Sequence, residues 1–306
     1  MIDNFISIHD LTLYQFSKIL DISREIKDNP HRFRNKLKGK ILAMIFQKPS
    51  LRTRMTFEVG MLQLGGEAVY LSPSDIQIGT RETVYDMGKN LERWIDAIMI
   101  RTFAHQNVID LAQSCHIPVI NALTDLLHPC QAMADFFTLK EKRGDLANFK
   151  LAYVGDGNNV CHSLLSAAAK AGSKMSVATP PGYEPDPEIR KQAEEDGKET
   201  GASFSFTNDP SEAVKNADAI YTDTWASMGQ EQEKEKRGEI FAPFQVNKSL
   251  MAKAKKGAFF MHCLPAHRGE EVTDDVIDSS QSLVYDQAEN RLHVQKVIML
   301  SLLGKK

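Results

Sequence analysis

The chain has 306 residues, which at roughly 150 residues per domain predicts two domains. Hydrophobic residues make up 42% and charged residues 25%, close to the globular average, so disordered, collagen-like and low-complexity proteins are excluded. The 37 basic and 40 acidic side chains give a net charge of −3, which excludes a bulk polyanion binder. We therefore expect no nucleic-acid partner, and any bound anion must be held by a local group of residues.

The apolar runs and the cysteines indicate the compartment. No apolar run approaches the ~20 residues of a membrane span, so we expect no membrane partner. The four cysteines, Cys115, Cys130, Cys161 and Cys263, form no CxxC pair and suit reduced thiols. The first residues carry no basic or apolar leader and no targeting signal. We therefore expect a cytoplasmic protein.

In chain order, the first expected element is a helix opened by Asp10, with Leu13, Phe16 and Leu20 on one face. Strand and helix patterns then alternate. The expected strands up to residue 143 are 40–46, 67–71, 97–100 and 119–120, and the expected helices are 54–64, 82–92 and 130–143.

A second alternating series begins near residue 150. Its expected strands are 151–154, 176–178, 218–222 and 258–261, and its expected helices are 160–171, 187–195 and 290–303. Alternating elements predict an α/β fold of two doubly wound, parallel-sheet domains with helices on both faces. The densely charged stretch 230–239 suits a solvated loop or, alternatively, a mobile loop over the site.

Ligands in open α/β sheets bind beyond the carboxyl ends of the strands, so the residues after each strand are informative. After the first buried strand, Ser50, Arg52, Thr53 and Arg54 precede a helix. Free N–H groups at a helix start favour an anion, and arginines fork onto phosphate oxygens. The segment lacks the Gly-Lys-Ser/Thr of a Walker loop, so it predicts a phosphate site of another kind, or a basic helix start without a ligand.

Two other strand exits carry polar residues. Arg101 follows one strand and could hold an anion or form a rim ion pair. His128, Pro129, Cys130 and Gln131 open a helix after the next strand, where Pro suits the first turn. His128 could be a site residue or a structural histidine.

The later strand exits leave further alternatives open. Gly155 and Gly157 form an incomplete dinucleotide loop, with Val160 where a third glycine belongs, so NAD binding is weakly indicated. Asp223 could hold a cationic amine. The segment from His262 to His267 contains two histidines and Cys263, but no second ligand pair for zinc.

Four motifs in this order resemble those of the transcarbamoylases and, within them, the ornithine carbamoyltransferase family. The motifs are Ser50-x-Arg52-Thr53-Arg54, His128-Pro129-Cys130-Gln131, Asp223-x-Trp225-x-Ser227-Met228-Gly229 and His262-Cys263-Leu264-Pro265. The resemblance implies a carbamoyl-phosphate domain, residues 1–143 completed by a closing helix at about 290–306, and an ornithine domain, residues 150–285. It also implies a homotrimer or a multiple of trimers, with sites at subunit interfaces, and neither cofactor nor metal.

The same resemblance implies the site residues. The carbamoyl-phosphate site would comprise Ser50, Leu51 (through its backbone), Arg52, Thr53, Gln77 (from a neighbouring subunit), Arg101, His128, Pro129, Cys130, Gln131, Cys263, Leu264 and Arg291. The ornithine site would comprise Asn159, Asp223, Ser227 and Met228. The catalytic residues would be Arg101, His128, Asp223 and Cys263. His162 stands where many relatives have Asn.

The implied reaction is attack of the δ-amine of L-ornithine on carbamoyl phosphate, giving L-citrulline and phosphate in arginine metabolism. Thr53, Arg101 and His128 would stabilise the carbamoyl oxyanion. Asp223 and Cys263 would orient the amine or accept its proton. The alternatives are a sibling enzyme with another acceptor, such as putrescine or aspartate, and a non-catalytic phosphate-binding protein.

Overall fold

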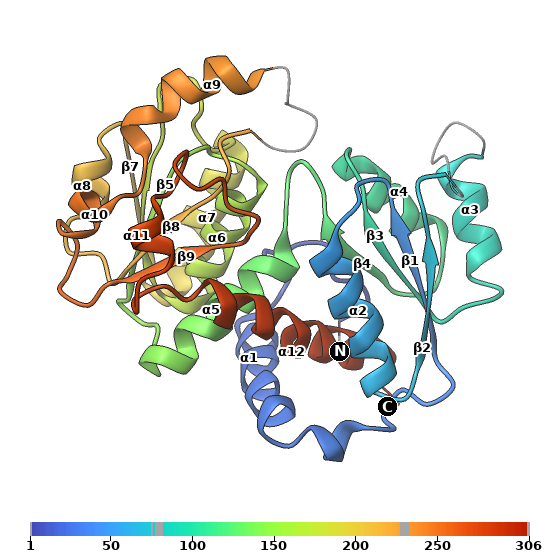
Figure 1. Cartoon of the computed structure of the whole chain (residues 1–306). Helices are drawn as coiled ribbons and strands as arrows, with labels where there is room; N and C mark the ends of the chain where they lie inside the picture. Colours follow the sequence, from blue (N-terminus) through green and yellow to red (C-terminus); the bar gives the residue numbers. More distant parts are fainter. Residues whose placement is uncertain (1, 75, 77–81, 227–232, 305–306) are drawn as a thin grey trace. The chain divides into compact units, whose positions relative to one another are not determined.

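The structure is a computed structural model that describes residues 2–74, 76, 82–226 and 233–304 (Figure 1). The chain forms two compact units. Unit 1 comprises Met1–Phe137 and Asn290–Lys306, and unit 2 comprises Thr138–Glu289. Each unit contains a parallel sheet, so the predicted α/β class is confirmed. No helix in the described part of the chain is long and apolar enough to cross a membrane.

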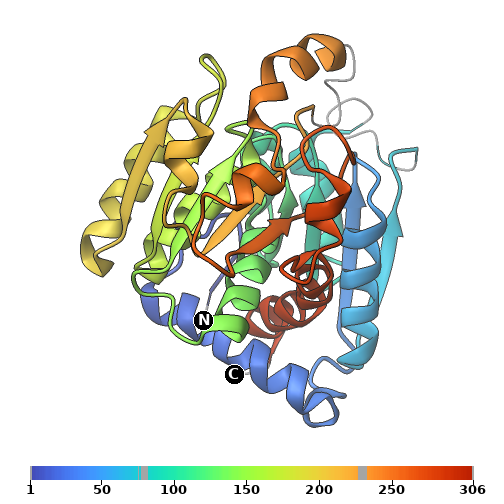
Figure 2. The same cartoon turned by 60° about the vertical axis from the view of Figure 1, so that its left-hand side comes forward.

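Unit 1 contains a four-stranded parallel sheet in the order β2-β1-β3-β4. Its strands are β1 (Ile41–Phe46), β2 (Glu67–Leu71), β3 (Ala97–Arg101) and β4 (Val119–Leu123). Its helices are α1 (Leu13–Asp28), α2 (Leu51–Gln63), α3 (Val84–Leu91) and α4 (His105–Ser114), with parts of α5 (Pro129–Arg143) and α12 (Val284–Leu303). Helix α2 packs beside β2 (Figure 2, blue and light blue).

Strands β1, β3 and β4 of this sheet are almost entirely buried, as expected for apolar strands covered on both faces, whereas the edge strand β2 is partly exposed. Ile45, Ile98 and Ile100 lie on one face and form a core with Met87 of α3 and Leu111 of α4. The alternate strand residues point to the opposite face. The four carboxyl ends therefore meet at one edge of a rigid layer.

Helix starts in unit 1 differ from the sequence expectation. Helix α1 begins at Leu13 because Thr12 makes a capping box with Gln15, with hydrogen bonds of 3.2 and 2.9 Å in the two directions. The expectation that Asp10 opens this helix is wrong. Helix α2 begins at Leu51, three residues earlier than expected, because the Ser50 hydroxyl accepts a hydrogen bond from the Thr53 N–H at 3.3 Å.

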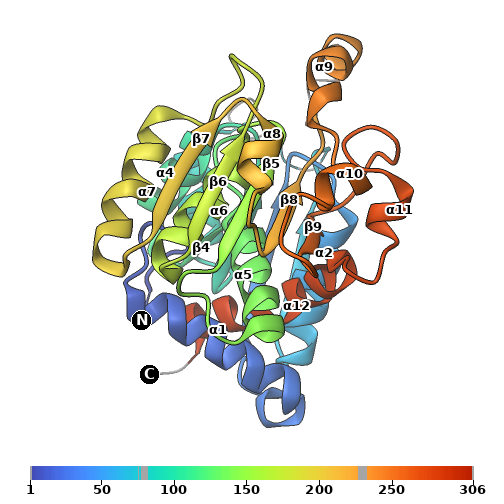
Figure 3. The ribbon, with the colours of Figure 1, turned by 90° about the vertical axis from the view of Figure 1, so that its left-hand side faces the viewer.

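Unit 2 contains a five-stranded parallel sheet in the order β7-β6-β5-β8-β9 (Figure 3). Its strands are β5 (Lys150–Val154), β6 (Lys174–Ala178), β7 (Ser203–Thr207), β8 (Ala219–Thr222) and β9 (Phe259–His262). Its helices are α6 (Asn159–Ala171), α7 (Pro187–Thr200), α8 (Pro210–Val214), α9 (Lys234–Phe241), α10 (Lys248–Met251) and α11 (Asp274–Ile277).

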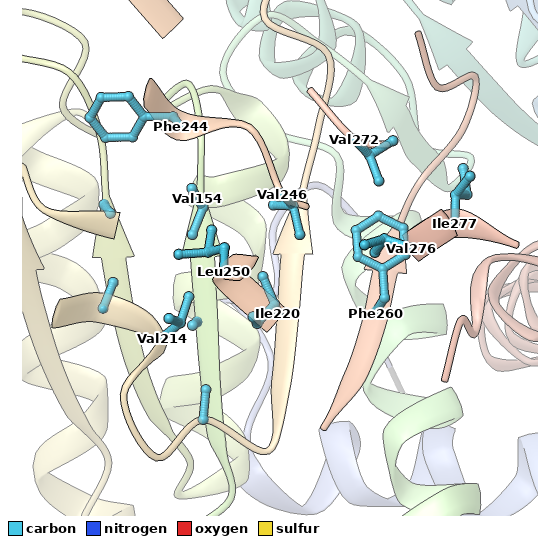
Figure 4. Close-up of a cluster of buried hydrophobic side chains, with 14 of the residues drawn as sticks. Val154, Val214, Ile220, Phe244, Val246, Leu250, Phe260, Val272, Val276 and Ile277 are labelled. Atoms are coloured by element: carbon cyan, nitrogen blue, oxygen red, sulfur yellow. The ribbon is translucent and has the colours of Figure 1, made fainter. Parts of the chain in front are cut away.

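One face of this sheet packs against the short helices of unit 2. Val154, Ile220 and Phe260, from β5, β8 and β9, form a buried cluster with Val214 of α8 and Leu250 of α10 (Figure 4). Strand β7, helix α4 and the helices α8 to α11 were not predicted, and α9 forms in part of the charged stretch 230–239 that was expected to be a loop. Strand β7 has the sequence SFSFT and lies at the sheet edge, where alternate serines face outward.

Candidate functional site

Each unit has a topological switch point, where consecutive strands depart to opposite sides of the sheet. In unit 1 this point lies between β1 and β3, and in unit 2 between β5 and β8. A crevice forms outside the carboxyl ends of such strand pairs and is the usual ligand position in open α/β sheets. Ser50 and Thr53 follow β1 and Asp223 follows β8, so each unit carries one candidate site. The motifs at His128 and His262 belong to β4 and β9, the strands next to these pairs.

The unit 1 site is built on the N-terminus of α2. The Ser50 hydroxyl lies 3.1 Å from the Thr53 hydroxyl, and Thr53 is fully buried. The Arg291 guanidinium donates to the Thr53 hydroxyl at 2.8 Å. The helix start therefore carries free backbone N–H groups, two hydroxyls and a buried cation, which together favour an anion.

A second branch of this network fixes the first turn of α5. Arg291 also donates to the Gln131 side-chain oxygen at 2.9 Å, and the Gln131 amide donates to the Asp135 carboxylate at 2.8 Å. All three side chains are buried. The Asp135 carboxylate thereby fixes which end of the Gln131 amide faces Arg291. The predicted residues Thr53, Gln131 and Arg291 are in direct contact.

The three other arginines that the sequence places at this site differ in their surroundings. Arg101 is the last residue of β3 and is 8% exposed, and Arg52 in the first turn of α2 is half-buried. Arg54 instead lies over the Tyr70 ring at 3.9 Å and pairs with Glu58 at 3.3 Å. Of the two motif arginines expected at the anion, Arg54 therefore has a separate role in packing.

The remaining predicted residues of this site differ in what they can offer a ligand. The Leu51 side chain is 76% exposed, and the Cys130 thiol donates to the Asn121 carbonyl at 3.4 Å. Both residues can therefore contact a ligand mainly through their backbone groups. Burial raises the pKa of Cys130 to about 12, so its thiol stays protonated. Pro129 is the first residue of α5, a position that favours proline because a backbone N–H there would have no partner within the helix.

His128 is buried directly before α5. Burial, followed by the positive charges of Arg291, Arg101 and Arg52, lowers the pKa of His128 well below its ordinary value. The imidazole is therefore neutral at pH 7. A neutral ring keeps one N–H to donate to a polarised oxygen and adds no further positive charge to the site.

Because the pKa of His128 is depressed by folding, its protonation is linked to stability. Below about pH 6.5 the unfolded chain takes up a proton that the folded chain does not, so the free energy of unfolding falls as the pH falls. We expect His128→Gln to reduce this loss between pH 7.5 and pH 5.5 in urea unfolding experiments. If the free energy of unfolding fell equally in the unsubstituted protein and in His128→Gln, the conclusion that His128 is neutral in the folded protein would be wrong.

Lys48 is a buried cation near this site that the sequence analysis missed. Its ammonium pairs with the Asp125 carboxylate and lies 4.3 Å from the centre of the Phe103 ring. These contacts connect the segments that follow β1, β3 and β4. The position of Lys48 directly after a buried strand could have indicated a site residue. Its partners, Asp125 and Phe103, are more than 50 residues away in the sequence and could not be identified from it.

The unit 2 site is centred on Asp223, directly after β8. One carboxylate oxygen accepts from the Asn158 amide at 2.8 Å, and the other accepts from the Cys263 thiol at 3.0 Å. Asp223 is 6% exposed and Cys263 is half-buried. The structure therefore brings two predicted residues, Asp223 and Cys263, into direct contact.

Asn158, which the sequence analysis did not select, connects this carboxylate to α6. Its side-chain oxygen caps the helix by accepting from the Val160 and Cys161 N–H groups at 3.0 and 3.2 Å. Its amide is thereby directed at Asp223. The predicted ligand Asn159 is the first residue of α6. An Asn before a helix is a capping signal, which could have identified Asn158.

Arg237 of α9 is another missed residue. Its guanidinium donates to the Asp156 carboxylate at 2.9 Å and to the Trp225 carbonyl at 2.8 Å. Burial raises the pKa of Asp156 to about 6, against the opposing effect of Arg237. Trp225 stacks on Phe241 with ring centroids 5.9 Å apart, in agreement with a packing role.

The space beside Gly157, in the glycine-rich segment after β5, is filled by another part of the chain. A Cβ on Gly157 would lie 2.3 Å from the Pro185 nitrogen and 2.6 Å from the Tyr183 carbonyl oxygen, and the Gly157 N–H donates to Tyr183 at 2.9 Å. In a dinucleotide fold the second glycine admits the pyrophosphate. Here it admits the segment from Tyr183 to Pro185, which argues against NAD binding.

Among the described residues, two groups of side chains offer metal-ligand atoms within 4.8 Å of one another. In the group Asp223, His262 and Cys263, the His262 Nδ1 accepts from the Leu264 N–H at 2.8 Å and its Nε2 lies 3.2 Å from Glu271. Both ring nitrogens are thus engaged, which leaves two ligands rather than the three or four of a zinc site. The second group is His267, Glu270 and Glu271.

Three predicted residues, Gln77, Ser227 and Met228, lie outside the described residues. Leu264 follows Cys263 with a backbone φ of 57°. The Nε2 of His162, at the position where the family resemblance led us to expect Asn, accepts from the Asp186 N–H at 2.9 Å, so this ring anchors the start of α7.

Comparisons with known proteins agree over the whole chain. Residues 3–141 match the family model described as "Aspartate/ornithine carbamoyltransferase, carbamoyl-P binding domain", and residues 147–302 match "Aspartate/ornithine carbamoyltransferase, Asp/Orn binding domain". A protein of Pyrococcus horikoshii named ornithine carbamoyltransferase is 56% identical over 96% of this chain and 91% of its own length.

Two matches come from Pyrococcus furiosus. A protein named "Ornithine carbamoyltransferase, anabolic" is 55% identical over 96% of this chain and 92% of its own length. A solved ornithine carbamoyltransferase structure matches with a TM-score of 0.96 and 53% identity, covering 99% of this chain and 98% of that one.

Proposed function

The chain belongs to the aspartate/ornithine carbamoyltransferase family, and we propose that it transfers the carbamoyl group of carbamoyl phosphate to the δ-amine of L-ornithine. The products are L-citrulline and phosphate. The observation that supports this most is the buried network of Thr53, Gln131 and Arg291 at the N-terminus of α2. It places one buried cation and a hydroxyl beside the N–H groups of the helix start, a donor set that suits the phosphate group of an acyl phosphate.

In this proposal, unit 1 holds carbamoyl phosphate. Ser50, Arg52, Thr53 and the N–H groups of α2 bind the phosphate, and Arg101 lies at the end of the neighbouring strand. Neutral His128 and the groups around it donate to the carbamoyl oxygen. Removal of one such donor typically costs about 10²–10³ in rate.

Unit 2 holds the amine. An alkyl amine with a pKa of about 10.4 is mostly protonated at pH 7 and cannot attack a carbonyl. The Asp223 carboxylate attracts and orients the ammonium. It takes up the amine proton either directly or by way of Cys263, whose sulfur accepts that proton as the thiol passes its own to Asp223. Asn159, Ser227 and Met228 are the further proposed contacts of L-ornithine.

We propose that the chain acts as a homotrimer or a multiple of trimers in the cytoplasm, in the biosynthetic direction. Exposed apolar side chains near the edge strand β2 support self-association: Val69 in β2, Leu51, Met55 and Leu62 in α2, and Tyr85 in α3. None of the four cysteines forms a disulfide, as a reducing compartment favours. Light scattering of the purified protein measures the assembly.

The function is tested by product formation from carbamoyl phosphate with L-ornithine, putrescine or L-aspartate as parallel acceptors, with EDTA present. We expect citrulline from L-ornithine and no product from the other two. Product from putrescine alone would leave the unit 1 site intact and overturn the assignment of the acceptor. No product from any acceptor would overturn the enzymatic proposal.

A further inference from the structure

A buried histidine and a buried glutamate lie directly behind the Cys263 segment. His262 is the last residue of β9, and its side chain is fully buried, as is that of Glu271. The His262 Nε2 lies 3.2 Å from a Glu271 oxygen, and its Nδ1 accepts from the Leu264 N–H at 2.8 Å. The ring therefore connects Glu271 to the backbone immediately after Cys263.

These contacts fix the tautomer of His262. Because a backbone N–H can only donate, Nδ1 must be the unprotonated acceptor nitrogen. The proton of the neutral ring then lies on Nε2, where it is donated to Glu271. A carboxylate that fixes a histidine tautomer and ring orientation is a common means of positioning the group that the histidine contacts.

Glu271 is itself firmly held. The same carboxylate oxygen accepts from the His267 N–H at 2.6 Å, and the Glu271 carbonyl accepts from the Val246 N–H at 2.9 Å, next to the bridge between Val246 and Val272. These contacts hold the Glu271 carboxylate in a fixed position within unit 2. It has no described contact with Asp223 or with the Cys263 thiol.

The segment held by His262 carries two of the proposed site residues. Leu264 has a φ of 57°, a left-handed conformation that is energetically unfavourable for a residue with a branched side chain. Such a conformation persists only where the surrounding structure imposes it. The Leu264 N–H bond to His262 supplies such a constraint. On the preceding residue, the Cys263 thiol donates to Asp223 at 3.0 Å.

We propose that Glu271 and His262 are positioning residues that hold the Cys263–Leu264 backbone so that the thiol meets Asp223 in the reactive geometry. The inference rests on the proposed carbamoyl transfer and deepens it. Glu271 acts through His262, and His262 acts through the Leu264 N–H. Loss of the carboxylate acceptor lets the ring turn and releases the segment.

The first test compares Glu271→Leu with Glu271→Gln. The leucine removes both acceptor oxygens, and we expect kcat for citrulline formation to fall about 10²-fold, as a displacement of roughly 1 Å at reacting groups causes. Glutamine keeps an acceptor oxygen, and we expect kcat to fall no more than about threefold. The KM for carbamoyl phosphate should stay unchanged in both. Equal kcat values in the two variants would overturn the proposal.

The second test does not depend on activity. Cys263 is half-buried and the other three cysteines are buried, so iodoacetamide should alkylate Cys263 first, as peptide mass spectrometry can verify. We expect Glu271→Leu to increase the alkylation rate of Cys263 about fivefold or more without alkylation of the other cysteines. An unchanged rate would refute positioning even if the protein forms no citrulline. Alkylation of all four would indicate general loosening and would also refute it.

A second pair of variants applies if Glu271→Leu does not fold. Asparagine at position 262 places an oxygen near the former Nδ1 and can still accept from the Leu264 N–H, whereas leucine cannot. We expect His262→Asn to retain at least about tenfold more activity and a slower Cys263 alkylation than His262→Leu. Indistinguishable His262→Asn and His262→Leu proteins would overturn the proposal.

Discussion

Asp223→Asn is expected to lower kcat/KM for L-ornithine by about 10²-fold or more, with little change in the KM for carbamoyl phosphate. Both Asp223 oxygens accept hydrogen bonds, one from the Asn158 amide and one from the Cys263 thiol. An asparagine replaces one acceptor with an NH₂ group, which must face another donor, and it removes the charge that attracts the ammonium. Steady-state kinetics with each substrate varied in turn provide the measurement.

The same strand offers a matched control. Asp218 lies just before β8, at the opposite edge of the sheet, and accepts from Arg143 at 2.5 Å and from Lys255 at 2.9 Å. Asp218→Asn removes a carboxylate of comparable burial without touching the proposed site. It should leave both KM values unchanged. If the Asp223 and Asp218 variants had equal kinetics, the amine role of Asp223 would be wrong.

The second large effect is expected for Arg101→Lys, with a loss of about 10²-fold in kcat. The planar guanidinium can donate to phosphate and carbamoyl oxygens at once, whereas the lysine ammonium is a compact charge that cannot form the same fork. Arg101 is 8% exposed at the end of β3, so water can replace the lost donors only poorly. Citrulline formation at saturating substrate measures the change.

Arg93→Lys is the control for this substitution. Arg93 is exposed and lies before β3, at the amino end of the strand. The same chemical change at the far edge of the sheet should alter kcat by less than about twofold. A comparable loss in both variants would mean that the Arg101 effect does not come from its place at the strand exit.

Much of the unit 1 site could be predicted because its residues are close together in sequence. Ser50, Arg52 and Thr53 occupy one strand exit, and a helix start after a strand indicates an anion site in any α/β protein. The start of α2 was predicted three residues too late for one reason. Propensity does not reveal that Ser50 caps the helix, and with that cap Arg52 and Thr53 become part of its first turn.

The residues that were missed make contacts between segments far apart in the chain. Asn158 and Asp223 are 65 residues apart, Arg237 and Asp156 are 81 apart, and Lys48 and Asp125 are 77 apart. Local sequence identifies Asn158 only as a helix cap and Lys48 only as a charge after a strand, and does not reveal the partner of either. Their pairing depends on sheet order, which places β8 beside β5 although five elements separate them in the chain.

The Arg291 contacts have a consequence for the order in which this protein is made. Arg291 belongs to the last segment of unit 1, which is synthesised only after all 152 residues of unit 2. Domains generally fold as the chain leaves the ribosome, from the N-terminal end. Until the ribosome has passed unit 2 and translated Arg291, the nascent residues up to Phe137 therefore leave Thr53 and Gln131 without their guanidinium donor. A ribosome stalled before Asn290 would carry a chain that cannot yet assemble its anion site.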